Sequence, residues 1–241
     1  MSFSARQPAT VTLREAVTTV CRDRAWWLHC LGYGGAATTL IGLPLAAGFV
    51  MESVDNSRRG FPTPLPPWSD PSTRYLAGLL ALLIDITFFV FPAILGALLS
   101  FCVGITLVLG ARGPDPTLVM LWIMLLTTPL PIGLFLSSVA PVARLRFADE
   151  GRIEKALSRD VLHWALRPDV RPTLVRARLI SLPTYLPALG LMAMAGGLLR
   201  FTFPGQGVLL LAIVWLMMAA LVFAHLVVVQ IYVATERQLG S

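Results

Sequence analysis

The pattern of apolar positions is dominated by one run from Tyr75 to Gly110, in which Asp85 is the single charged residue. A continuous helix over this run would extend about 54 Å at 1.5 Å per residue. A bilayer core is only about 30 Å thick. The run therefore predicts a membrane segment that is either long and kinked at Pro92 or divided there into two.

Four further apolar runs complete this pattern. The run at 26–51 contains five glycines and Pro44. That composition favours close helix packing, or a bent, re-entrant path near Gly42 and Pro44. The other three runs cover residues 117–140, 179–199 and 207–233. Together the runs predict an all-α integral membrane protein with four to six membrane segments.

Two polar stretches carry apolar residues at helical spacing instead. One is residues 10–22, and the other is residues 151–167 within the main polar segment, 141–178. Such sequences are typical of amphipathic helices that lie at the membrane interface. We therefore expect an N-terminal interfacial helix in residues 1–25 and a single multi-pass membrane domain over residues 26–241.

Composition narrows the class of protein further. Hydrophobic residues make up 56% of the 241 residues and charged residues 13%, whereas soluble domains carry about 25% charged residues. The net charge is +6, but no soluble basic module is present that would bind nucleic acid. The three cysteines form no CxxC pair, so no zinc site or disulfide framework is expected. The expected surroundings are the lipid bilayer and other membrane subunits.

The basic residues predict how the chain faces, because short cytoplasmic loops are enriched in arginine and lysine. Six segments with a cytoplasmic N-terminus place 14 basic residues inside and 5 outside, and five segments with an external N-terminus place 13 and 6. A re-entrant 26–51 with a single crossing at 75–110 places 17 inside and 2 outside. This last arrangement fits best, with six segments as the alternative. It predicts location in the cell membrane, with segment 141–178 and the C-terminus cytoplasmic.

Three pieces of the sequence resemble one known family in order along the chain. They are Trp26 and Trp27 with LGYGG at 31–35 and Pro44, then RRGFPTPLPPWSD at 58–70, then FADEGRIEKAL at 147–157. The chain is similar in these pieces to the uncharacterised membrane family catalogued as domain of unknown function 4013. The insert FPTP departs from the family pattern. The resemblance implies membrane location and no particular activity.

Asp85 is the most unusual residue for a membrane segment, because a carboxylate at that depth usually needs a partner. In the favoured topology Asp85 lies at a depth of about 15 Å and His225 at about 12 Å from the same side. We therefore expect Asp85 and His225 to be in contact, directly or through water. The pair would fix the register of two helices, or serve as a proton relay or ligand site. The remaining alternative is a protonated Asp85, or one that reaches the interface.

No catalytic motif and no metal site is found in the sequence. GxSxG, HExxH and paired acidic motifs are absent, and LGYGGAA lacks the lysine and the strand of a phosphate loop. No cofactor is predicted, although His29 and His225 are weak candidates for haem or chlorin ligands.

Two sets of surface residues are predicted to meet the lipid. The basic face of the second amphipathic stretch would bind anionic headgroups, or would only mark the cytoplasmic side. Its candidate residues are Arg152, Lys155, Arg159, Arg176 and Arg178. The candidate interfacial anchors are Trp26, Trp27, Trp68 and Trp164. Trp68 lies between prolines and polar residues, so a docking loop is its alternative role.

Two functions follow from these features, and a third, a lipid-active membrane enzyme, would need a catalytic motif that is not found in the sequence. The lack of catalytic motifs and the many small residues favour a non-catalytic scaffold or accessory subunit of a larger membrane complex. The broken segment 26–51 and the intramembrane Asp85 favour a transporter or channel for a small molecule or ion, using Asp85 and His225. A polar cavity that reaches Asp85 would favour the transporter or channel, and a dry core with a lipid-facing or partner-facing apolar groove would favour the scaffold.

Overall fold

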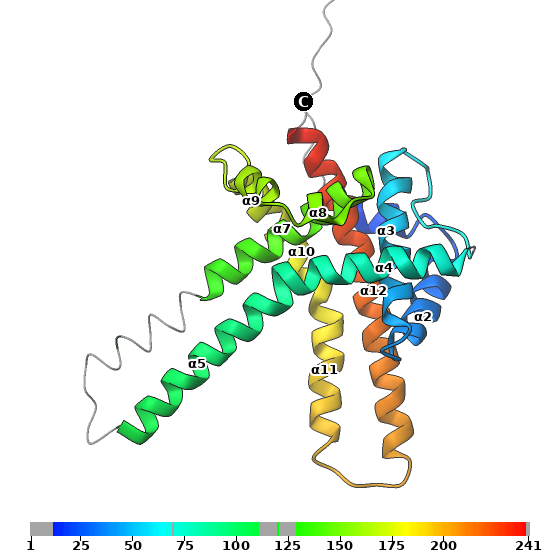
Figure 1. The fold of residues 1–241 in the computed structure, drawn as a ribbon. Coiled ribbons are helices and arrows are strands. Elements are labelled where there is room, and N and C mark those ends of the chain that lie inside the picture. The colour runs from blue at the N-terminus through cyan, green and yellow to red at the C-terminus, as the bar shows by residue number, and fades with distance from the viewer. Residues whose placement is uncertain (1–11, 69, 111–119, 121–128, 240–241) are drawn as a thin grey trace, which may run out of the picture.

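The computed structural model describes residues 12–68, 70–110, 120 and 129–239. All regular elements in these ranges are helical (Figure 1). The predicted all-α class is therefore confirmed.

Eleven stretches of α-helix and two irregular turns follow one another along the described chain. They are α1 (Leu13–Val20), α2 (Trp26–Ala37), α3 (Leu43–Arg58), α4 (Pro71–Asp85), the π-helical turn η1 (Ile86–Val90), α5 (Phe91–Gly110), α7 (Pro129–Glu150), α8 (Ile153–Ala156), α9 (Arg159–Ala165), α10 (Arg171–Ser181), the 3-10 turn η2 (Leu182–Tyr185), α11 (Leu186–Leu198) and α12 (Gln206–Leu239).

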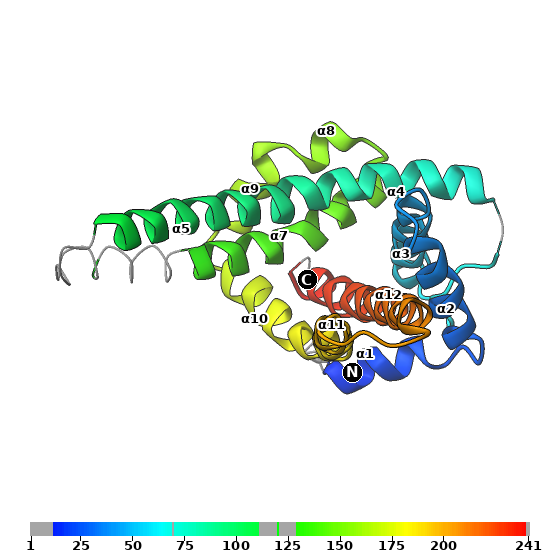
Figure 2. The same cartoon turned by 90° about the horizontal axis from the view of Figure 1, so that it is seen from below.

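The long helix α12 is the axis of the molecule. Residues in its C-terminal half, such as Leu226, Val227 and Tyr232, are almost fully buried. It packs against α1, α2, α3, α10 and α11, and Figure 2 shows α2 and α3 on one side of it and α5 and α7 on the other. A helix that is apolar all round is covered either by other helices or by lipid. The C-terminal half of α12 is covered by other helices.

Two continuous helical stretches of the described residues are long and apolar enough to cross a membrane. They are Arg171–Leu198, which combines α10, η2 and α11, and Gln206–Leu239, which is α12. They form a hairpin that turns at residues 199–205 (Figure 1). The expectation of four to six segments stays a prediction, and the expected span over 117–140 lies partly outside the described residues.

The apolar run at 26–51 is not one helix. Its first part forms α2, which ends at Ala37. The chain then turns through residues 38–42 and continues in the opposite direction as α3. Trp26 packs on Phe223 of α12 with ring centroids 5.1 Å apart, while Gln230 Nε2 donates a hydrogen bond of 2.7 Å to Ser57 Oγ at the far end of α3. Both ends of this hairpin therefore lie against the C-terminal half of α12.

The run at 75–110 continues through Pro92 without reversing (Figure 1). Pro92 is the second residue of α5, and the irregular turn is η1 just before it. Proline has no N–H and its ring collides with the carbonyl four residues earlier. The π-helical turn, in which the Phe91 N–H donates to the Ile86 carbonyl, gives the helix the extra residue that relieves this collision. The expected irregularity is therefore real but lies one turn earlier.

Glycines allow α3 and α4 to cross closely. A Cβ added to Gly78 would collide with the carbonyl oxygen of Pro44, and one added to Gly48 would collide with that of Arg74. Only glycine permits backbones to approach to this distance. This crossing fixes the start of α4, and with it the direction in which α4 leads to Asp85.

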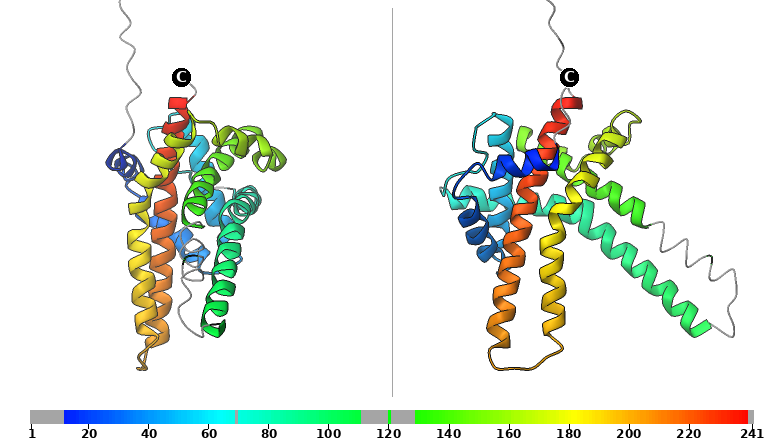
Figure 3. Two further views of the ribbon diagram at one scale, coloured as in Figure 1. Left: turned by 90° about the vertical axis from the view of Figure 1, so that its left-hand side faces the viewer. Right: turned by 180° about the vertical axis from the view of Figure 1, so that it is seen from behind.

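The two amphipathic stretches differ in outcome. α1 begins with a capping box between Thr12 and Glu15, buries Ala16 and Val20, and lies across α12 (Figure 3, right). The single helix expected over 151–167 is wrong, because the chain breaks between α8 and α9, where Ser158 is extended (φ −68°, ψ 154°). Its apolar residues still face inward.

Candidate functional site

A cavity of about 910 Å³ lies between α3, η1, α7, the α10–α11 stretch and α12. Its volume is near the upper end of the range typical of small-molecule sites. Most of its lining is aliphatic. The side chains in the lining that can form polar contacts are Asp85, Ser137, Arg144, Arg178, Tyr185, His225 and Tyr232.

Asp85 forms an ion pair with Arg144 of α7 across this cavity. The Arg144 residue is only 8% exposed, so the pair is largely removed from solvent. The predicted partner, His225, is therefore replaced by a permanent cation. The reason is that α7 does not end where the polar segment begins. It continues past Pro141 to Glu150, which brings Arg144 into the interior.

His225 lines the same cavity but bonds within its own helix. Its Nδ1 lies 2.7 Å from the carbonyl oxygen of Leu221, and its ring meets the Tyr185 ring edge-on at 5.7 Å between centroids. Asp85 and His225 thus line one cavity, but the contacts described for each of them go to other groups.

Arg178 is the second cation of the cavity, and its bonds go to neutral groups. Its Nε donates to Ser137 Oγ at 3.1 Å, and its NH1 donates to Tyr185 Oη at 3.4 Å. The guanidinium also lies 5.3 Å from the centroid of the Tyr185 ring. No carboxylate of the described residues pairs with Arg178. Among the described lining residues two arginines thus face one aspartate.

Two further polar atoms at the cavity have no hydrogen-bond partner within the described chain. They are Arg144 Nε and Tyr232 Oη, and both are buried. An unsatisfied buried donor costs about 1–3 kcal/mol. Buried polar groups are almost always bonded to protein or to ordered water. The cavity lining therefore offers two free polar atoms that can donate a hydrogen bond.

The apolar part of the lining reaches the surface of the protein. Ile86 of η1 and Leu186 and Leu189 of α11 line the cavity and are 48%, 63% and 50% exposed. The cavity is consequently open to the side, between η1 and α11, rather than sealed.

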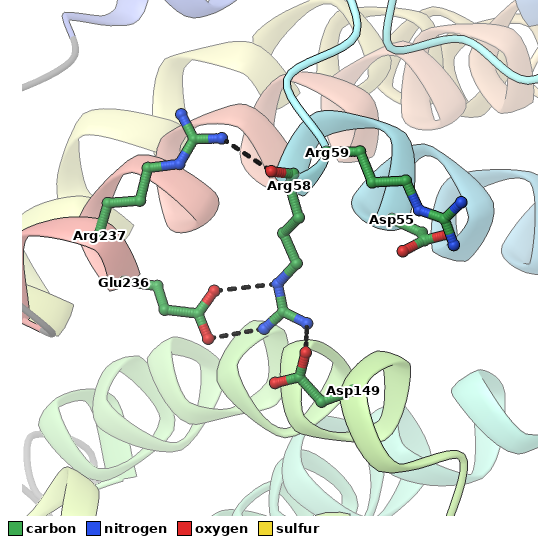
Figure 4. Close-up of polar contacts among 6 residues, drawn as sticks. All are labelled: Asp55, Arg58, Arg59, Asp149, Glu236 and Arg237. Carbon is green, nitrogen blue, oxygen red and sulfur yellow. Dashed lines mark hydrogen bonds and ion pairs between the residues drawn. The ribbon is translucent and has the colours of Figure 1, made fainter.

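A separate group of charges joins the C-terminal ends of three helices (Figure 4). Arg58 of α3 donates from Nε and NH2 to the carboxylate of Glu236 at 3.1 and 2.6 Å, and pairs with Asp149 of α7. Arg237 donates to the Ser57 carbonyl at 2.8 Å. We call Arg58, Asp149, Glu236 and Arg237 the ionic latch.

His29 belongs to an aromatic stack rather than to the cavity. Its ring lies between Phe49 and Trp68, with centroids 5.5 and 5.0 Å away, and Tyr33 stacks on the same Trp68 at 4.8 Å. Arg74 lies 5.7 Å from the Tyr33 ring centroid. His29 and His225 therefore lie in different regions, and a haem or chlorin role for either one stays a prediction.

The predicted headgroup residues separate into two groups. Arg152, Arg159 and Arg176 are exposed, and Lys155 pairs with Glu150 at 2.5 Å. Arg178 alone of this set lines the cavity. Contact of these residues with lipid headgroups stays a prediction.

The four tryptophans also differ in their surroundings. Trp27 and Trp68 are exposed and Trp26 and Trp164 are partly buried. Trp68 packs over Gly32, where a Cβ would collide with its ring. An anchoring role at the interface stays a prediction for all four. Cys21, Cys30 and Cys102 are free thiols. Burial raises the pKa of the Cys21 thiol, which keeps this thiol protonated.

The fold and the cavity define the class of protein. It is an all-helical protein with two membrane-length helical stretches and a laterally open, mostly apolar cavity. Residues 35–182 match the model of the family described as "Protein of unknown function (DUF4013)". The chain therefore belongs to this family, as its resemblance implied. No curated protein and no solved structure matches the chain.

The matched residues are fewer than the resemblance suggested. They leave out Trp26, Trp27 and most of LGYGG, as well as the α11–α12 hairpin. Asp85, Arg144 and Arg178 lie inside the match, whereas His225 and Tyr232 lie outside it. The charged part of the cavity thus falls within the family region.

Arg144 and Arg178 are the functional candidates that sequence patterns underrated. Both were counted as residues of a polar cytoplasmic segment. The signal in the sequence is the position of Arg144 in VARL, an apolar stretch that directly continues the run 117–140. An arginine that adjoins a membrane segment in this way indicates an interior partner.

Proposed function

We propose that this chain is an integral membrane protein that takes a small amphiphilic molecule from the bilayer into its lateral cavity. The observation that carries the proposal is the cavity itself. Its volume is about 910 Å³, its lining is mostly apolar, and Asp85, Arg144 and Arg178 are part of that lining. Pockets of this size and chemistry are the usual binding sites of small molecules.

A membrane setting is supported by helix lengths and charges. Arg171–Leu198 and Gln206–Leu239 are long and apolar enough to cross, and α5 adds 20 residues without a charge. The basic residues of the latch and of segment 141–178 would then be cytoplasmic, as the charge rule expects. The α2–α3 hairpin would be re-entrant, covered by α12 and α4 as such backbone requires.

The charged side chains of the cavity support a small-molecule role over a scaffold. The lining is mostly apolar, as a groove for a partner would be, but it includes Asp85, Arg144 and Arg178, which an apolar partner would not need. Exposed apolar side chains on α11, such as Met192 and Met194, would be covered by lipid as well as by a partner. They therefore do not discriminate between the two functions.

The test is photolabelling of the full chain in lipid nanodiscs with a long-chain fatty acid that carries a diazirine. We expect the label on residues of η1, α11 and α12 that line the cavity. Leu189→Trp places a large ring at the open side and should reduce labelling severalfold. Met192→Trp is the matched control, because it adds the same ring to the same helix at an exposed position outside the lining.

Equal labelling of the two tryptophan variants would contradict the proposal, as would labels spread evenly over all lipid-facing helices. Circular dichroism of both variants checks that the helical content is unchanged.

A further inference from the structure

The charges at the cavity do not balance. Asp85 compensates Arg144, while within the described part of the chain the Arg178 guanidinium donates only to the hydroxyl groups of Ser137 and Tyr185. An uncompensated cation beside an apolar cavity is costly. A bound anion would remove this cost.

Two free donors line the same cavity as Arg178. They belong to Arg144 and Tyr232, the two described lining residues that have an unpartnered buried atom. Arg144 Nε can only donate, and Tyr232 Oη can donate. Donors without acceptors are the arrangement that recognises an oxyanion.

The apolar lining continues from Arg178 along one helical stretch. Leu182, Leu186 and Leu189 follow Arg178 along this stretch, and all three line the cavity, so they form a leucine stripe beside it. From Arg178 to Leu189 the helical rise is about 16 Å at 1.5 Å per residue. This length is close to half of a bilayer core of about 30 Å, which is the reach of one acyl chain.

We propose that the cavity binds a long-chain amphiphile with a single negatively charged oxyanion headgroup, with the headgroup at Arg178, Arg144 Nε and Tyr232 Oη. The tail lies along the leucine stripe of η2 and α11. One uncompensated arginine calls for one negative charge, and its planar fork fits both a carboxylate and a phosphodiester. This inference rests on the proposed function and adds the chemical class of the ligand.

The test compares an acid and an alcohol of equal chain length, hexadecanoate and hexadecanol, for binding to the detergent-purified full chain at mildly alkaline pH. Arg178→Gln removes the cation and keeps a donor. Arg176→Gln removes the same charge two residues away on α10 at an exposed position outside the cavity, so it is the control for binding to the basic surface, where Arg176 is expected to meet headgroups. A third ligand, phosphatidylglycerol, carries the same charge as a phosphodiester.

We expect the acid to bind more tightly than the alcohol. Arg178→Gln should weaken binding of the acid by about tenfold to a hundredfold, which is the range for hydrogen bonds to charged groups, and should leave the alcohol unchanged. Arg176→Gln should change neither. Tighter binding of hexadecanoate than of phosphatidylglycerol identifies a carboxylate as the headgroup, and the reverse identifies a phosphodiester.

Two results separate the failure of this inference from the failure of the proposed function. If acid and alcohol bind equally in all variants, or if Arg176→Gln weakens the acid as much as Arg178→Gln, the headgroup assignment is overturned and the cavity still binds amphiphiles. If neither acid nor alcohol binds, the proposed function itself is overturned. A second variant, Tyr232→Phe, removes one donor with little change of shape and should weaken only the acid.

Discussion

The ionic latch and the charged end of the cavity are both built around arginine, but they balance their charges differently. At the latch, Arg58 meets two carboxylates, Asp149 and Glu236 (Figure 4). At the cavity, Arg144 meets one carboxylate and Arg178 meets none among the described residues. The latch is complete as it stands, while the cavity is left with a net positive charge.

This difference separates structure from function. A compensated cluster at the ends of α3, α7 and α12 can hold helices together without any ligand. An uncompensated cation beside an open apolar cavity lowers stability unless something negative binds, and natural proteins keep such groups mainly at functional sites. The two clusters therefore predict different responses to mutation.

Arg144→Met should have the largest effect, because it leaves Asp85 in the interior without its partner. Removing one member of a buried pair costs about 3–5 kcal/mol. We expect this loss in chemical unfolding of the detergent-purified protein. The double variant Asp85→Leu/Arg144→Met removes both charges and should recover most of it. Equal stability of Arg144→Met and the natural chain would show that the pair is not compensating a buried charge.

Arg58→Met should have a smaller effect of about 1–2 kcal/mol, since the latch is partly exposed and solvent screens its charges. The loss should shrink as salt is added, whereas the effect of Arg144→Met should depend little on salt. A latch whose contribution is independent of salt would contradict its assignment as a surface cluster.

Arg178→Gln should leave the stability of the ligand-free protein unchanged or raise it by about 1 kcal/mol, because the loss of two bonds to neutral hydroxyls is offset by the removal of an uncompensated charge. Thermal unfolding with and without hexadecanoate measures this. The natural chain should gain stability from the acid through mass action, and the variant should not. A large loss of stability without ligand would make Arg178 a structural residue.

Arg59→Gln should have the smallest effect. Arg59 pairs with Asp55 at 2.7 Å across one helical turn, and its side chain is 64% exposed. Such pairs contribute about 0.3–0.5 kcal/mol. This variant is the baseline for the latch, because it removes an arginine next to Arg58 in the sequence. Unfolding measurements at low salt compare the two variants. An effect as large as that of Arg58→Met would remove the distinction between the two.

Local patterns in the sequence predicted much of the fold. The break in 26–51 follows from its glycines and Pro44, and the apolar face of residues 151–167 is the one that is buried. These features depend on spacing within a few residues, which a sequence displays directly. The kink expected at Pro92 appears as an irregular turn that precedes it, Ile86–Val90, because the proline ring collides with a carbonyl of the preceding turn.

The contacts between charged residues at the cavity could not be predicted from such local patterns. Asp85 and Arg144 are 59 residues apart, and their contact depends on α7 extending into a segment that reads as polar. Depth alone suggested His225, because helical rise predicts height in a membrane but not which face of a neighbouring helix lies opposite. The charge balance at Arg178 likewise appears only when three helices are brought together.

The most direct test of the central claim is native mass spectrometry of the full chain released from lipid nanodiscs. We predict one bound anionic amphiphile per chain, retained in Arg176→Gln and lost in both Arg178→Gln and Leu189→Trp. A bare natural chain, or an adduct that is equally abundant in all four proteins, would contradict the account.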